Sequence, residues 1–235
     1  MSDKLVFDEK THLYTLNGSE LVSVTKLIKS HFPEFEAEKI AGYVAKSRGV
    51  SVQMVLDEWA KKRDASIERG NRIHSLAEVL MLNEKCDIVF CDKKEKEEAL
   101  RLELKINQLK EKYELVSCEI QMYSEKYMIA GTADLIMLDR KNNEAIIFDW
   151  KTNAQIKKKG HRGSKGLGEL SHLEDCNFIH YALQLNIYEY LYGVECKKKL
   201  IHITDKAISE IDIPDLSKEV DVILRNRRKE ILDVF

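Results

Sequence analysis

The feature that most constrains the fold is a pair of apolar segments joined by a short polar run. Residues 133–138 and residues 145–148 each have the length and apolar content of a buried strand. The second segment continues directly into Asp149-Trp150-Lys151. Because side chains alternate along a strand, Asp149 and Lys151 should share one face while Trp150 points to the other. The pattern therefore predicts a carboxylate beside an ammonium at a strand end.

The polar run from Asp139 to Glu144 predicts a hairpin turn between these strands. With the turn centred between Lys141 and Asn142, Asp134 lies opposite Asp149; with a slip of two residues, Asp134 lies opposite Lys151. Facing residues of an antiparallel pair lie roughly 5 Å apart at Cβ. Either register gathers two acids and a lysine on one patch of sheet, and only a slip of one residue would scatter them.

Two acids at that spacing can hold a hard cation such as Mg²⁺ through oxygen, and such ions stabilise in-line displacement at phosphorus. The lysine can then orient or deprotonate a water, or neutralise charge on the phosphate. The alternative interpretation is a hairpin that carries a surface salt bridge, because Asp-x-Lys alone often occurs by chance.

Two predicted helices flank this hairpin and carry polar pairs four residues apart. Upstream, residues 70–78 (Gly-Asn-Arg-Ile-His-Ser-Leu-Ala-Glu) place His74 and Glu78 on one helix face; downstream, residues 181–188 do the same for Gln184 and Tyr188. A neutral imidazole at His74 could complete a metal site. Each pair also fits an ordinary amphipathic helix.

Four motifs follow one another along the chain: residues 70–78, Asp134, Asp149-Trp150-Lys151 and residues 181–188. In this order they resemble the PD-(D/E)XK nuclease superfamily, and within it the RecB-like branch. That branch includes the nuclease domains of RecB and AddB and the mitochondrial genome maintenance exonuclease. Residues 70–78 are similar to its G-x-x-x-H-x-x-x-E helix, and Gln184 with Tyr188 to its Q-x-x-x-Y helix. The resemblance runs from about residue 70 to residue 192; residues 6–25 also look like the front end of phage and bacterial RecB-like nucleases, less specifically.

The resemblance implies a role for each matching residue. Lys151 would be the catalytic lysine, and Gln184 and Tyr188 would support it or contact the nucleic acid. A divalent ion, Mg²⁺ or Mn²⁺, would be bound by the following groups: His74, Asp134, Asp149 and the backbone carbonyl of Trp150.

Two further acids are candidates for fixing the orientation of these ligands. Glu78 shares a helix face with His74, and Glu119 lies on the strand predicted before the core hairpin. Glu119 could equally be a solvent-facing strand residue.

At 235 residues, with two prolines and no Gly/Ser linker, the chain is expected to form one domain, residues 1–235. Within it we expect an N-terminal hairpin and helical region (1–112), a catalytic α/β core (113–213) and a C-terminal helix (214–235). The fold class expected is α/β, a mixed central sheet flanked by helices. No transmembrane-length apolar run or signal peptide is evident, which predicts a cytoplasmic or otherwise intracellular protein without membrane contact.

The boundaries expected for individual elements follow from apolar periodicity and capping residues. Ser23 or Thr25 should cap a helix that runs through Lys29, and Asp92 should cap a helix with an apolar stripe from Ala99 to Tyr113. The remaining predictions are a hairpin (5–7 with 13–16), helices at 36–47, 51–61, 65–82, 176–192 and 215–232, and strands at 114–123, 127–138, 145–152, 199–204 and 207–213.

A net charge of −2 gives no general attraction to a polyanion, so DNA binding needs a local basic surface. The segment after the catalytic strand, residues 157–168, is basic and rich in glycine, which predicts a mobile loop that closes over a phosphate backbone; the alternative is a disordered, merely soluble loop. The residues expected to contact DNA there are Lys157, Lys158, Lys159, Arg162 and Lys165.

Cys86, Cys91, Cys118, Cys176 and Cys196 lack the clustered spacing that an iron–sulfur cluster needs, and no C-x-x-C occurs. We therefore expect no iron–sulfur cluster, no structural zinc and free thiols.

The function predicted is that of a Mg²⁺- or Mn²⁺-dependent deoxyribonuclease. The resemblance favours an exonuclease on single-stranded or frayed DNA ends in replication, recombination or repair. Without a helicase motif, unwinding would require a helicase or recombination protein as partner. The alternatives are a non-cleaving DNA-binding module and a structure-specific endonuclease.

Overall fold

The computed structural model describes residues 4–8, 11, 13–84 and 92–233. Within these residues the chain is α/β: a mixed eight-stranded sheet with six α-helices around it. The strands are β1 (Leu5–Asp8), β2 (Leu13–Leu16), β3 (Ser19–Ser23), β4 (Tyr113–Ser124), β5 (Ile129–Asp139), β6 (Glu144–Lys151), β7 (Cys196–Ile203) and β8 (Ile208–Asp212). The helices are α1 (Val24–Lys29), α2 (Ala37–Arg48), α3 (Val52–Leu82), α4 (Lys93–Lys112), α5 (Asn177–Tyr192) and α6 (Ser217–Leu232). The fold class expected from the sequence is confirmed.

The sheet runs in the order β1-β2-β3-β5-β6-β7-β8, with β4 paired to β5. Two pairs are parallel, β3 with β5 and β6 with β7, and the others are antiparallel. The parallel pair β6–β7 is joined through α5, the crossover that a parallel connection requires.

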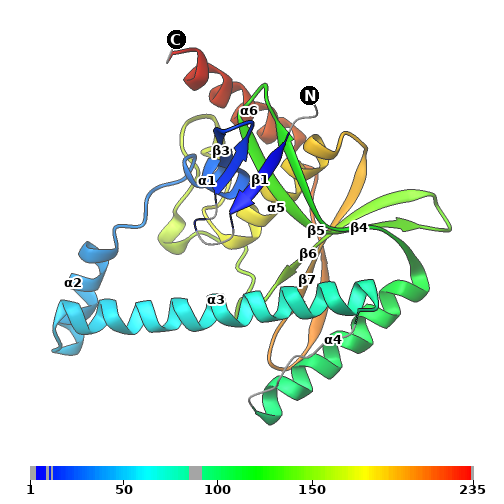
Figure 1. The fold of residues 1–235 in the computed structure, drawn as a ribbon. Helices are drawn as coiled ribbons and strands as arrows, with labels where there is room; N and C mark the ends of the chain where they lie inside the picture. Colours follow the sequence, from blue (N-terminus) through cyan, green and yellow to red (C-terminus); the bar gives the residue numbers. More distant parts are fainter. Residues whose placement is uncertain (1–3, 9–10, 12, 85–91, 234–235) are drawn as a thin grey trace.

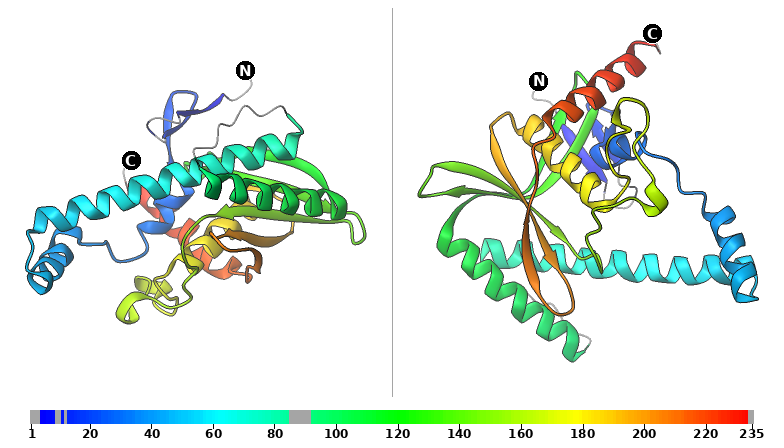
Figure 2. Two further views of the ribbon diagram at one scale, coloured as in Figure 1. Left: turned by 90° about the horizontal axis from the view of Figure 1, so that it is seen from below. Right: turned by 180° about the vertical axis from the view of Figure 1, so that it is seen from behind.

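Helices cover both faces of this sheet, as the two views in Figure 2 make visible. On one face, Ile146, Phe148 and Trp150 of β6 pack with apolar residues of α3 and α4. On the other face, Ile147 packs with residues of α1, α5 and α6. The alternation along β6 therefore places Trp150 on the α3 face and directs Asp149 and Lys151 to the α5 face, as predicted.

The β5–β6 hairpin adopts the first of the two registers considered. Leu135 pairs with Phe148 and Asp139 with Glu144, so continuing the ladder sets Asp134 opposite Asp149. Asp139 closes the turn by accepting a hydrogen bond from the backbone N–H of Lys141 (2.9 Å). The turn chemistry thereby fixes which residues meet at the other end of the hairpin.

Helix α3 corrects the expectation of two helices over residues 51–61 and 65–82. It is a single helix of 31 residues, capped by the Ser51 hydroxyl, which accepts from the N–H of Met54 (3.1 Å). Residues 61–68 are all exposed, so this stretch has no apolar stripe, although it contains no proline or glycine that would stop the helix. In Figure 1, α3 crosses the width of the molecule and carries α2 at its far end.

Other boundaries moved by a few residues, and one strand was not predicted. Ser23 caps α1 and Asp92 caps α4, as predicted. Strand β7 begins at Cys196 rather than residue 199, because parallel pairing with β6 extends it. Strand β3 was missed. Among the described residues, no helix combines the length and apolar character that crossing a membrane would require.

Candidate metal centre

The candidate site lies where the sheet divides beside β5. Strand β4 pairs along the whole of β5, so the other edge of β5 is shared by β3 and β6. Strand β3 pairs with Ile129 and Ala130, and β6 pairs from Leu135 onward. Residues 131–134 (Gly-Thr-Ala-Asp) fall between β3 and β6, so on this edge, opposite β4, their backbone groups pair with no described strand and side chains can bond there.

Asp134 links the diverging strands with its side chain. It is buried, and its Oδ2 accepts a hydrogen bond from the backbone N–H of Trp150 (2.7 Å). The carboxylate takes the place of a backbone acceptor at the position where the β5–β6 ladder ends. Its other oxygen, Oδ1, lies 3.6 Å from Nδ1 of His74.

His74 reaches the sheet from α3. Its Nε2 lies 3.1 Å from the carbonyl oxygen of Trp150, so Nε2–H is the donor of this hydrogen bond. In the neutral ring this leaves the lone pair on Nδ1, the nitrogen that faces Asp134. The Trp150 carbonyl, predicted as a metal ligand, thus lies at the site and also orients the imidazole.

Glu119 joins His74 and Asp134 in a group whose ligand atoms all lie within 4.8 Å of one another. Its neighbours Cys118 and Ile120 pair with Leu135 and Ala133, which sets Glu119 opposite Asp134. Its φ of 51° departs from strand geometry. Glu119 is half-buried, which corrects the alternative of a solvent-facing strand residue, and it completes a set of two carboxylates and one imidazole suited to a divalent cation.

Asp149 and Lys151 form an ion pair beside this group. Asp149 is buried, and its Oδ2 lies 2.5 Å from Nζ of Lys151. The ammonium also lies 4.8 Å from the ring centroid of Tyr181 on α5. Asp149, predicted as a metal ligand, is not one of the three residues of the 4.8 Å group. In this structure it primarily holds the lysine.

The negative charge of the carboxylates at this site is only partly balanced by nearby positive charge. Burial, with the nearby charges of Asp134, Glu78 and Asp149, raises the pKa of Glu119 to about 8. Burial also raises the pKa of Asp149 to about 6, against the opposing effect of Lys151. Glu78, predicted to fix the orientation of the ligands, is one of these nearby charges. Like charges held this close in a buried place favour binding of either protons or a cation.

Gln184 and Tyr188 lie on the α5 side of the same site. Nε2 of Gln184 donates to the hydroxyl of Tyr188 (2.9 Å), and both residues are buried. The Tyr188 ring packs against Gly131, where an added Cβ would lie 2.6 Å from Cε1 of the ring. A glycine is therefore required at the start of the Gly-Thr-Ala-Asp motif for Tyr188 to reach this depth.

Tyr14 of the N-terminal hairpin was not predicted as part of this region. Its hydroxyl lies 2.8 Å from Oγ1 of Thr132 in the same motif. The hairpin therefore supports the divided part of β5.

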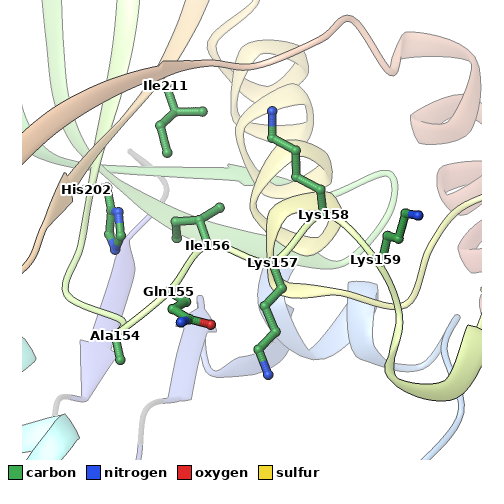
Figure 3. Close-up of a pocket in the computed structure, with 8 residues that line it drawn as sticks. All are labelled: Ala154, Gln155, Ile156, Lys157, Lys158, Lys159, His202 and Ile211. Atoms are coloured by element: carbon green, nitrogen blue, oxygen red, sulfur yellow. The ribbon is translucent and has the colours of Figure 1, made fainter.

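The basic segment after β6 is folded, but its lysines diverge. Residues 154–159, with His202 and Ile211, line a surface cavity of about 630 Å³. In Figure 3, Lys157 and Lys158 point in opposite directions and Lys159 in a third. Lys165 is paired with Glu174, and Arg162 is exposed. The five basic residues predicted to contact DNA therefore do not converge on one point in this structure.

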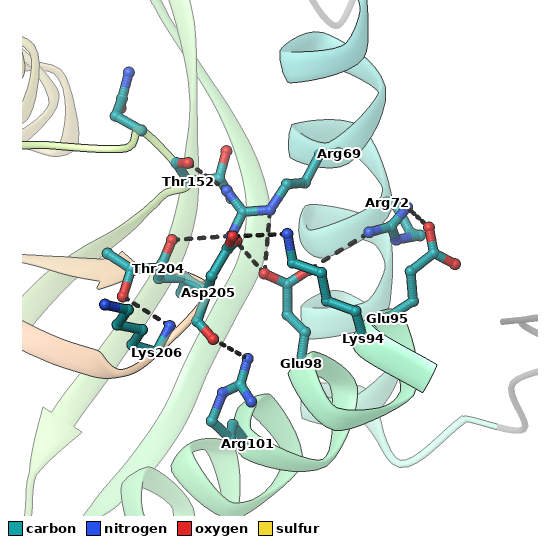
Figure 4. Close-up of polar contacts among 12 residues, drawn as sticks. Arg69, Arg72, Lys94, Glu95, Glu98, Arg101, Thr152, Thr204, Asp205 and Lys206 are labelled. Atoms are coloured by element: carbon teal, nitrogen blue, oxygen red, sulfur yellow. Dashed lines mark hydrogen bonds and ion pairs between the residues drawn. The ribbon is translucent and has the colours of Figure 1, made fainter. Parts of the chain in front are cut away.

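A partly buried polar network on the α3 face fixes the helix that carries His74 (Figure 4). Arg69 donates to the carbonyl of Thr152 just beyond β6 (2.5 Å) and to the carbonyl of Ile203 in β7 (3.3 Å). It also pairs with Glu98 of α4, which is 5% exposed and is shared with Arg72. This clamp, formed by Arg69, Arg72 and Glu98, fixes the position of α3 relative to the end of β6. No sequence pattern predicted it.

The described cysteines lie outside the metal-ligand group. Cys118, Cys176 and Cys196 are free thiols, whereas Cys86 and Cys91 lie outside the described residues. Burial raises the pKa of the Cys118 thiol to about 12, so it stays protonated beside Glu119.

Two solved structures are similar to this chain. A protein described as SSO0001 shares 21% sequence identity at a TM-score of 0.41, over 90% of this chain and 74% of that one. A protein from Eubacterium rectale described as a "putative exonuclease" shares 12% identity at a TM-score of 0.38, over 91% of this chain and 79% of that one. No protein-family model matches the chain, and no curated protein matches it.

Proposed function

We propose that this protein is a metal-dependent nuclease that hydrolyses phosphodiester bonds in DNA. The observation that carries the proposal is the group formed by His74, Glu119 and Asp134, whose ligand atoms lie within 4.8 Å of one another beside the Asp149–Lys151 ion pair. The resemblance of the motifs around these residues to the RecB-like branch of the PD-(D/E)XK superfamily supports the same activity.

The residues at the site fit a hard divalent cation. Two carboxylates and an imidazole suit Mg²⁺ or Mn²⁺, and the raised pKa values of Glu119 and Asp149 mark negative charge that a cation would offset. Such an ion supplies Lewis-acid stabilisation of the phosphodiester and of an attacking water. We expect His74, Glu119 and Asp134 to hold it, with Asp149 and the Trp150 carbonyl as further oxygen donors.

Without a bound cation, Lys151 is held as an ammonium. Burial alone would lower its pKa, but Asp149 and Asp134 raise it above its usual value. In this form the lysine can orient water or donate to a phosphate oxygen. Water attacks phosphorus in line and gives up a proton, while the bond to the 3′ oxygen breaks and that oxygen takes up a proton. The products carry a 3′ hydroxyl and a 5′ phosphate. Gln184 and Tyr188 keep the wall behind Lys151 in place.

We infer further that the enzyme is an exonuclease on single-stranded or frayed ends, working in replication, recombination or repair with a helicase or recombination protein. This finer assignment rests on the family resemblance. It implies an intracellular protein that needs no membrane.

In the deciding experiment, the purified protein is incubated with linear DNA and with covalently closed DNA. Each substrate is tested separately with Mg²⁺, with Mn²⁺ and with chelator. End-labelled single and double strands, labelled separately at the 5′ and 3′ ends, report polarity and strand preference. Metal-dependent release of nucleotides from linear DNA alone is the expected result. Cutting of closed circles would instead indicate an endonuclease, and DNA binding without cleavage under any metal would indicate a non-cleaving module.

A further inference from the structure

A second cavity lies on the α5 side of Lys151. It has a volume of about 420 Å³, within the range of roughly 300–1,000 Å³ that is typical of small-ligand sites. It is bounded by α1, by the end of β6 and by α5, which pack against one another on this face of the sheet (Figure 1). The residues that line it are Thr25, Ile28, Lys29, Lys151, Asn177, His180, Tyr181 and Gln184.

The charge of this lining has one sign. Two ammonium groups, Lys29 and Lys151, line the cavity, and no carboxylate is among its lining residues within the described chain. Lys151 is partly neutralised by Asp149 behind it. Lys29 is exposed and, among the described residues, makes no ion pair within 4 Å. The cavity therefore offers an available positive charge to an anionic ligand.

The uncharged part of the lining is held rigidly. The Tyr181 hydroxyl donates to Oδ1 of Asn153 (2.6 Å), and the Gln184 amide is bonded to Tyr188. Asn177 accepts from the N–H of Lys157 and donates to the carbonyl of Gln155, which ties the wall to the basic segment. Side chains fixed in this way lose little entropy when a ligand binds.

His180 adds a neutral surface. Its Nε2 lies 3.1 Å from Oδ1 of Asp175, and its ring packs on Phe32 with centroids 4.3 Å apart. Burial lowers the pKa of His180 in spite of Asp175. The attraction for an anion at neutral pH therefore comes from the lysines.

We propose that this cavity binds one nucleotide of the DNA strand, the one next to the phosphodiester that is cut, with its phosphate at Lys29 and Lys151 and its sugar and base against Ile28 and Tyr181. The proposal deepens the proposed function and rests on it for the position of the cut. The lining combines two ammonium groups with the apolar side chain of Ile28 and the aromatic ring of Tyr181, a combination that matches a nucleoside monophosphate rather than a bare anion.

The test is a calorimetric titration of the metal-free protein, in chelator, with thymidine 5′-monophosphate, and separately with inorganic phosphate and with thymidine. The expected result is that the monophosphate binds about tenfold or more tightly than either half, because both sets of contacts contribute. Lys29→Ala should weaken this binding about tenfold, the loss of one charge-assisted contact. Lys26→Ala, on the same helix but outside the cavity lining, should bind as the wild type does.

Equal binding by Lys29→Ala and wild type overturns the proposal, and so does inorganic phosphate binding as tightly as the monophosphate. Cleavage assays separate this outcome from the proposed function. If DNA is cut while Lys29→Ala leaves both binding and KM unchanged, the nuclease stands and the cavity assignment falls. If the monophosphate binds through Lys29 while DNA is never cut, the nucleotide site stands and the nuclease assignment falls.

Discussion

Oδ2 of Asp134 accepts a hydrogen bond from the backbone N–H of Trp150 at 2.7 Å, and the carbonyl of the same tryptophan accepts one from His74 at 3.1 Å. Three elements, β5, β6 and α3, are thus joined around one residue. The site residues are held at fixed separations by backbone bonds as well as by packing, the arrangement that a preformed metal centre needs.

This relationship separates the structural role of Asp134 from its chemical role. Asp134→Asn keeps an oxygen that can accept from the Trp150 N–H, so the fold should persist. Metal affinity should fall by more than the roughly 10–100-fold that is typical when a residue bonded to a ligand, rather than the ligand itself, is changed. Asp134→Ala should lose metal and also about 1–3 kcal/mol of unfolding free energy, because the buried N–H loses its acceptor. Thermal unfolding with and without Mn²⁺ measures both effects. Unchanged Mn²⁺ stabilisation of Asp134→Asn would contradict the ligand assignment.

Lys151→Met should abolish cleavage while metal still binds. It also leaves Asp149 buried without its partner, which raises the pKa of Asp149 further above about 6. A carboxyl group whose pKa is raised on folding does not destabilise the protein at pH values below its pKa in the unfolded state. Above that pH it lowers the unfolding free energy progressively more as pH rises. We therefore expect a loss of about 3 kcal/mol near neutral pH that shrinks in acid. Lys197→Met, which breaks the exposed pair with Glu144, is the control and should change unfolding and cleavage little.

The stability of the metal-free protein should depend on pH through Glu119. Its pKa rises from 4.5 to about 8 on folding, so the folded state binds the proton more tightly. The destabilisation is absent below pH 4.5 and grows as pH rises towards 8. Glu119→Gln should remove this part of the pH dependence in thermal unfolding curves. In the wild type, Mn²⁺ should raise the Tm more in alkali than in acid, because protons compete for Glu119; a Tm shift independent of pH would contradict this.

Gly131→Ala should displace Tyr188. The added Cβ would lie 2.6 Å from the ring, and the ring is buried and bonded to Gln184, so it cannot move freely. We expect a loss of about 1–3 kcal/mol, the usual cost of overpacking, measured by urea unfolding. In a Tyr188→Ala background the same substitution should cost much less. An equal cost in both backgrounds would show that the clash lies elsewhere. Gly42→Ala, where nothing lies within 4 Å of the added Cβ, is the matched control.

Glu98→Ala should loosen α3 and weaken metal binding from a distance. Glu98 is 5% exposed and is shared by Arg69 and Arg72. Removing it takes a shared partner from two half-buried arginines, although Arg72 keeps Glu95 and Arg69 keeps Asp205 and two backbone carbonyls. We expect a cost of about 1–3 kcal/mol. Glu97→Ala on the same helix breaks only the exposed pair with Lys93 and should cost under about 0.5 kcal/mol. Similar losses in both variants would argue against the clamp.

Local patterns in the sequence determined several parts of the site. Alternation along β6 determined that Asp149 and Lys151 share a face, and the turn chemistry at Asp139 set the β5–β6 register. Spacing of four residues placed His74 and Glu78 on one helix face. These properties depend on residues that lie close together in the chain. The sequence alone was enough to predict the shared faces, whereas it left two hairpin registers open, and the structure shows which of them forms.

Other features depended on contacts between distant segments and could not be predicted in this way. Helix α3 continues through residues 61–68, whose exposed side chains form no apolar pattern that would predict the helix. Glu119 entered the ligand group only because β4 pairs with β5 at Asp134, and Lys29 came near Lys151 only because α1 packs against α5. Periodicity identifies which face a residue occupies, whereas the residue that meets it there is chosen by long-range pairing and packing, which only the tertiary structure decides.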